Sequence, residues 1–187
     1  MADTQLTVKQ IELLLHNSGI WNKRQDVMIP NLSWGLLNHE ADFVAVTKSG
    51  YLTEVEIKRS FSDLKADFKK DVFHKDERVY RFMYCLPLSI REKALTLFHE
   101  QYGKVAELYG HDRNYKYVNE FFPYIIWYDE KGHLSVEPNK LDSRSGARKL
   151  FIEEREIIGR LASLRYWDLA NKVTEFPNEP KKIILRL

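Results

Sequence analysis

The chain has 187 residues, with 29 basic and 27 acidic side chains, 44% hydrophobic content and 13% aromatic content. This composition predicts a single domain with a well-formed core and excludes an intrinsically disordered chain. No run of roughly eighteen apolar residues and no secretory leader pattern is present. We therefore expect a cytoplasmic protein with no membrane contact, in which the single cysteine, Cys85, is a buried core residue. The net charge of +2 is too small to indicate nucleic acid by itself.

Hydrophobic periodicity and turn residues predict an α/β fold with a mixed central sheet and helices on its faces. The elements expected in chain order are a helix at 4–16 capped by Thr7, strands at 26–32, 40–47 and 51–58, a helix from Ser60 or Ser62 to about Asp71, a strand at 78–86, a helix from Ser89, a hairpin of strands at 124–128 and 133–136, and a helix from 147 to about 171. Residues 1–187 form one domain in this prediction, with a core at about 4–110 and a C-terminal hairpin and helix at about 120–175. The tail at 182–186 fits either a short strand or a partner contact.

The strand at 51–58 carries charged side chains in an alternating pattern. Glu54, Glu56 and Lys58 should share one face of the strand, while Val55 and Ile57 point to the other face, into the core. The Cα atoms of Glu56 and Lys58 should lie roughly 6.5 Å apart. A carboxylate and an ammonium group can therefore converge on one small bound group.

A second acid precedes this pair on the neighbouring strand. Gly50 in the short link 48–50 indicates a hairpin, which can bring Asp42 close to Glu56. Two carboxylates completed by water suit Mg²⁺ or Mn²⁺. A metal ion polarises a phosphoryl oxygen, and a lysine beside it can position the attacking water or stabilise the growing negative charge. The alternative is that Glu56 and Lys58 form only an exposed surface pair, which contributes little.

The run from Asp42 to Glu56-Ile-Lys58 resembles the signature of the PD-(D/E)XK nuclease superfamily, although Glu40-Ala-Asp42 lacks the proline of the motif's name. The wider pattern resembles the MmcB-like, DNA-repair-associated bacterial and phage branch, on these segments: 40–46, 54–60, 63–67 and 79–87. The resemblance implies a restriction-endonuclease-like fold with an added C-terminal hairpin and long helix. It also implies a Mg²⁺-dependent DNA nuclease in repair, recombination or mobile-element biology, with homodimers as one known arrangement.

The resemblance also suggests a glutamate on the first helix that reaches the metal, and Glu12 is the acid within that helix. The implied catalytic residues are then Asp42, Glu56, Lys58 and Glu12, and the implied metal ligands are Asp42, Glu56 and Glu12. The alternative is that Glu12 is a solvated helix residue, and Glu40 and Glu54 are then the candidates for the additional acid. His39, just before the Asp42 strand, is interpreted as a hydrogen-bonded structural group in preference to a metal ligand.

Basic residues that follow the Glu-x-Lys pair form a candidate nucleic-acid contact. They would bind phosphates of DNA, with branched and single-stranded forms among the candidate substrates, and they are Arg59, Lys69, Lys70 and His74. The alternative is an exposed, salt-bridged helix, because an acidic ladder at four-residue spacing is interleaved with the lysines, namely Asp63, Asp67 and Asp71. For the whole chain, the alternative function is a catalytically inactive nucleic-acid-binding or protein-interaction module on the same fold.

Overall fold

The structure is a computed structural model that describes residues 5–32, 35–69, 76–109, 124–137 and 147–173. The described elements are α1 (Val8–Asn17), β1 (Val27–Leu32), β2 (Ala41–Val46), β3 (Leu52–Ile57), α2 (Phe61–Asp67), β4 (Val79–Pro87), a 3-10 helix η1 (Leu88–Ile90), α3 (Arg91–Tyr109), β5 (Tyr124–Tyr128), β6 (Leu134–Glu137) and α5 (Ile152–Val173). The helix predicted from Ser60 or Ser62 to about Asp71 is α2, which is capped by Ser60 and ends earlier, at Asp67. Residues 70–75 and the tail at 182–186 lie outside the described residues. No described helix is both long enough and apolar enough to cross a membrane.

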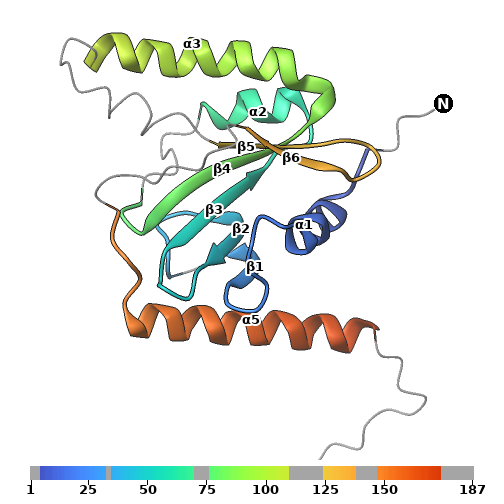
Figure 1. Ribbon diagram of the computed structural model, residues 1–187, viewed down its shortest axis with the longest axis vertical. Coiled ribbons are helices and arrows are strands. Elements are labelled where there is room, and N and C mark those ends of the chain that lie inside the picture. The colour runs from blue at the N-terminus through green and yellow to red at the C-terminus, as the bar shows by residue number, and fades with distance from the viewer. Residues whose placement is uncertain (1–4, 33–34, 70–75, 110–123, 138–146, 174–187) are drawn as a thin grey trace, which may run out of the picture.

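The six strands form one sheet in chain order, β1-β2-β3-β4-β5-β6 (Figure 1). Strands β1, β2 and β3 are antiparallel neighbours, β4 runs parallel to β3 and β5, and β6 returns antiparallel to β5. The predicted α/β class with a mixed sheet flanked by helices is therefore confirmed. The parallel β3–β4 pair requires a crossover connection, and α2 lies in that connection.

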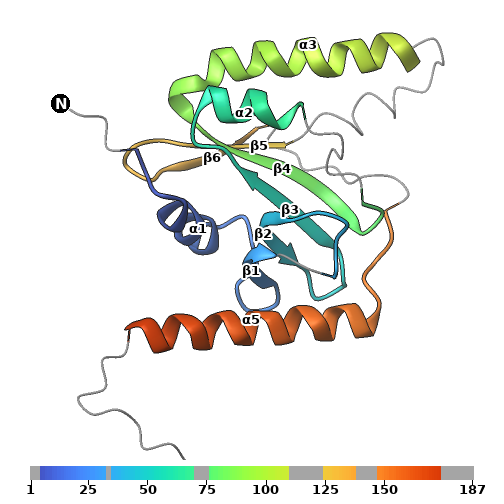
Figure 2. The same cartoon turned by 180° about the vertical axis from the view of Figure 1, so that it is seen from behind.

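Helices cover the two faces of the sheet with separate hydrophobic clusters. On one face, Ile11 and Leu15 of α1 pack in one hydrophobic cluster with side chains of the central strands, among them Val55 and Ile57 of β3 and Cys85 of β4. On the other face lie α2 and α3, side by side in both views, while α5 runs along the edge strand β1 (Figures 1 and 2). The central strands are thus enclosed between two layers, as expected of strands with parallel neighbours.

Hydrogen bonds account for where two of the helices begin. Thr7 caps α1 as predicted, in a capping box completed by Gln10. The C-terminal helix α5 begins at Ile152, later than the predicted residue 147. The preceding residues instead donate backbone hydrogen bonds to distant loops, from Arg148 to the carbonyl of Glu77 and from Leu150 to that of Gly50.

Candidate functional site

The structure brings Asp42 and the Glu-x-Lys strand together at the end of β3. Phe43 pairs with Val55 and Val44 with Glu54, so extending this antiparallel register by one residue sets Asp42 opposite Glu56. The Oδ2 atom of Asp42 also accepts a 2.8 Å hydrogen bond from the backbone N–H of Ile57. Asp42 therefore lies beside the backbone of Ile57, the residue after Glu56 at the end of β3, which is consistent with the expected approach of the two carboxylates.

The charged side chains of β3 (Leu52–Ile57) and that of Lys58, the residue directly after it, are buried. Glu54 is 0%, Glu56 4% and Lys58 6% exposed. Lys58 contacts Asp67 of α2, and Glu54 contacts His39 in the segment before β2. The alternative of an exposed Glu56–Lys58 surface pair is therefore wrong. Removing charges from water is costly unless each has partners, so these groups require compensation inside the protein.

The ammonium group of Lys58 is held between two carboxylates. Its Nζ atom donates to Oε1 of Glu56 at 2.5 Å and lies 3.1 Å from Oδ1 of Asp67, a residue of α2. The hydroxyl of Tyr84, on β4, donates to the other oxygen of Asp67 at 2.7 Å. Burial works to lower the pKa of Lys58, but the charges and hydrogen bonds of Glu56 and Asp67 outweigh it and raise that pKa. Lys58 is accordingly a fixed positive charge.

Sequence reasoning missed the role of Asp67. It placed Asp67 in an exposed acidic ladder, whereas the side chain is only 1% exposed. The packing of α2 against the sheet turns this acid inward. One signal was present in the sequence: Asp67 follows Leu64 by three residues and so shares the buried face of the helix.

Glu12 approaches the same region from α1. Its side chain is half-buried, and burial together with the negative charge of Asp42 raises its pKa, with Lys9 and Arg165 acting in the opposite direction. Arg165 comes from α5 and donates a 3.1 Å hydrogen bond to the carbonyl of Asn31. The carboxylates of Glu12 and Asp42 thus influence one another electrostatically although they belong to different elements.

The oxygen donors of this region suit a hard cation in their chemistry. In the part of the chain that the structure describes, no group of three or more His, Cys, Asp or Glu side chains has the arrangement of a complete metal site. Mg²⁺ commonly needs only one or two protein carboxylates, because water and substrate phosphates supply its remaining ligands. Asp42, with Glu12 and Glu56 nearby, fits that requirement.

Two of the four predicted phosphate-binding residues can be placed. Arg59 follows Lys58 directly. Its Nε atom donates to the carbonyl of Leu6 at 3.0 Å, which connects Arg59 to the segment before α1. Lys69 is exposed just beyond α2. Lys70 and His74 lie outside the described residues. Lys69 is therefore an exposed cation just beyond α2, whereas Arg59, just before α2, is half-buried.

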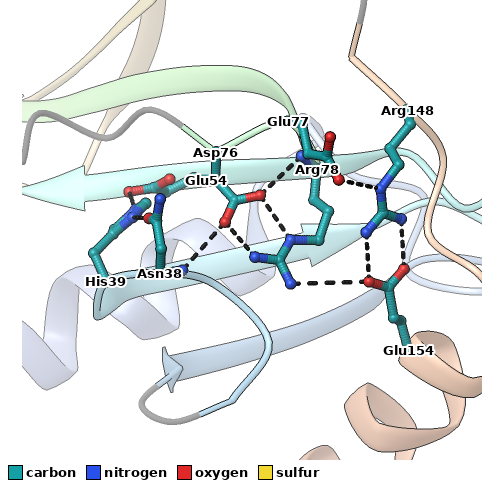
Figure 3. Close-up of polar contacts among 8 residues, drawn as sticks. All are labelled: Asn38, His39, Glu54, Asp76, Glu77, Arg78, Arg148 and Glu154. Atoms are coloured by element: carbon teal, nitrogen blue, oxygen red, sulfur yellow. Dashed lines mark hydrogen bonds and ion pairs between the residues drawn. The ribbon is translucent and has the colours of Figure 1, made fainter.

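A network of hydrogen bonds and ion pairs connects β3 with α5, as Figure 3 shows. It starts at the buried Glu54, which lies 2.8 Å from Nε2 of His39, in agreement with the structural interpretation of that histidine. The network continues through these residues: Asn38, Asp76, Arg78, Glu154, Arg148 and Glu77. Burial tends to raise the pKa of Asp76, but hydrogen bonds from Arg78 and the Asn38 N–H hold it below its ordinary value.

Comparison with known proteins does not assign the chain to a family. No family model and no curated protein matches it. A solved structure of a protein of unknown function from Silicibacter pomeroyi is similar over 83% of this chain and 87% of that one, with 10% sequence identity and a TM-score of 0.46. Neither a finer fold class nor an activity follows from a likeness of this degree.

Proposed function

We propose that the protein is a metal-dependent nuclease that hydrolyses DNA phosphodiester bonds. One observation carries the proposal, namely the burial of Glu56 and Lys58 at the end of a central strand, where Asp42 accepts a hydrogen bond from the intervening backbone N–H of Ile57. Buried ion pairs contribute little net stability compared with apolar side chains of similar size. Buried, partnered charges of this kind are a common feature of functional sites.

The order of elements supports the finer fold class that the sequence resemblance implies, a restriction-endonuclease-like fold. A helix, three antiparallel strands, a helix and a strand parallel to the third strand occur in that order. In this interpretation the hairpin β5–β6 and helix α5 are C-terminal additions. The same resemblance supports work in DNA repair, recombination or mobile-element biology, and assembly as a homodimer.

The proposed chemistry divides among the residues of the site. Asp42 and Glu56 would hold Mg²⁺ or Mn²⁺, and Glu12 is the further ligand that the sequence resemblance suggests. The bound ion would polarise the scissile phosphate and lower the pKa of an attacking water. Lys58 supplies a fixed positive charge next to Glu56, where it can stabilise negative charge that develops on the phosphate. A lysine whose ammonium is held by two carboxylates is suited to this role and not to removing a proton from water.

Surface cations around the site would position the substrate. Arg59 and Lys69 flank α2, and the sequence places Lys70 and His74 shortly after it. Such residues bind phosphates without reading sequence, so binding should weaken strongly as salt concentration rises. Branched, nicked and single-stranded DNA are the substrates to test first.

A specific observation favours a second candidate function, a catalytically inactive module that binds nucleic acid or a protein partner. The Lys58 ammonium occupies one oxygen of Glu56 directly, at 2.5 Å. If this contact persists with substrate present, Glu56 has less capacity to ligate a metal ion. The two candidates differ in metal binding and in turnover, so one set of variants distinguishes them.

The test combines calorimetry and cleavage. Mn²⁺ and Mg²⁺ binding is measured on wild type, Asp42→Ala/Glu56→Ala and the exposed-acid control Glu100→Ala, each with and without a short DNA. We expect binding and metal-dependent cleavage in wild type and control and loss of both in the double variant. Wild-type protein that binds DNA but neither binds metal nor cleaves would refute the nuclease and favour the inactive module. Equal cleavage by the double variant would refute the site.

A further inference from the structure

Asp67 makes a contact that the motif itself does not contain. It lies at the end of α2, eleven residues after Glu56, and its carboxylate reaches the Lys58 ammonium at 3.1 Å. Lys58 thus has carboxylates on two sides, one from its own strand and one from a helix. A lysine side chain has four rotatable bonds, so a single partner would leave its ammonium less well fixed than two partners do.

Tyr84 in turn fixes Asp67. Its hydroxyl donates to Oδ2 of Asp67 at 2.7 Å, which leaves Oδ1 directed at Lys58. The ring of Tyr84 is fully buried and contacts three other aromatic rings, with centroid distances between 5.0 and 6.2 Å, those of Phe68, Phe82 and Phe98. Packing from α2, β4 and α3 therefore holds the phenol, the phenol holds the carboxylate, and the carboxylate holds the ammonium.

We propose that Asp67, held by Tyr84, is a positioning residue that fixes the Lys58 ammonium beside Glu56. This inference rests on the proposed nuclease function, and it adds a residue that acts on the reaction through Lys58 without touching substrate. Groups that orient a functional side chain commonly matter nearly as much as the side chain itself. The arrangement also explains why an acid occupies a buried helix position where an apolar residue would pack at lower cost.

Cleavage kinetics give the first test. Asp67→Asn keeps the shape of the side chain and should lower kcat by about 10- to 100-fold with little change in KM for DNA. Tyr84→Phe should have a smaller effect in the same direction. Asp63→Asn, the same change at an exposed position of α2, should leave kcat unchanged. Thermal unfolding of each variant checks that it is folded under assay conditions.

A double-mutant cycle separates positioning from general structural damage. If Asp67 acts through Lys58, adding Asp67→Asn to Lys58→Met should cause no further loss of kcat. If the double variant instead loses kcat by the product of the two single-variant losses, the inference is overturned, because Asp67 would then act independently of Lys58.

The Lys58 ammonium itself gives a readout that does not depend on turnover. A buried, hydrogen-bonded ammonium exchanges slowly with water, so its ¹H–¹⁵N NMR signal should be visible in wild type and absent in Lys58→Met. We expect Asp67→Asn to shift or abolish the signal and Asp63→Asn to leave it in place. An unchanged signal in Asp67→Asn would overturn the inference. If wild type shows the signal but cleaves no DNA, the nuclease proposal fails, while the NMR comparison still decides whether Asp67 positions Lys58.

Discussion

Replacing Lys58 by methionine should destabilise the protein strongly, because it leaves two buried carboxylates without their cation. Glu56 and Asp67 are 4% and 1% exposed, and both contact the Lys58 ammonium within 3.1 Å. Removing one partner of a buried charge group costs about 3–5 kcal/mol. Since a domain of this kind is stable by only about 5–15 kcal/mol, the loss is a large share of the total free energy of unfolding.

The same reasoning predicts that neutralising the partners restores stability. The triple variant Glu56→Gln/Lys58→Met/Asp67→Asn contains no buried charge at this place and should recover most of the loss, although it should not cleave DNA.

Urea unfolding followed by circular dichroism measures these differences. A shift in midpoint at constant slope reports a change in stability alone. Lys69→Met is the matched control, because Lys69 is exposed and its loss should change stability by less than about 0.5 kcal/mol. If Lys58→Met at pH 7 is within about 1 kcal/mol of wild type, water reaches the site and the buried network described here is wrong.

Three further predictions concern other parts of the structure. Asp76→Asn should cost about 1.5–3 kcal/mol at pH 7 by weakening charge-assisted hydrogen bonds from Arg78. The pKa of Asp76 is held below its ordinary value, so its stabilising contribution is complete above pH about 4 and is lost on further acidification. The urea midpoints of wild type and Asp76→Asn should therefore converge as the pH falls below about 4. Gly50→Ala should destabilise the protein by about 1 kcal/mol or more. Gly50 has φ +87°, and an added Cβ would lie 3.3 Å from the carbonyl oxygen of Leu150. Thermal unfolding measures the loss of stability. Burial raises the pKa of the Cys85 thiol, so a thiol reagent should fail to label native protein and should label it in denaturant; rapid native labelling would contradict the packing of β4.

Local patterns in the sequence were sufficient for the elements that carry the candidate site. Alternation along β3 places Glu54 and Glu56 on one face, with Lys58 directly after the strand, and the glycine-containing link brings Asp42 to the end of this strand. These predictions depend on the geometry of a strand and a hairpin, which neighbouring residues determine. The metal ligation, the DNA contact and the catalytic roles remain predictions for the experiments above.

Burial of the site and the partners of its charges were decided only by tertiary structure. The acidic ladder in the sequence of α2 favours an exposed helix. The packing of that helix against the sheet instead turns Asp67 toward Lys58. Nor does local sequence indicate that Tyr84, on the parallel neighbour of β3, would reach that acid. The sequence by itself therefore determined which charges share a strand face. The packing of layers from distant segments determined which of them are removed from water, because burial depends on what covers a residue and not on its neighbours in the chain.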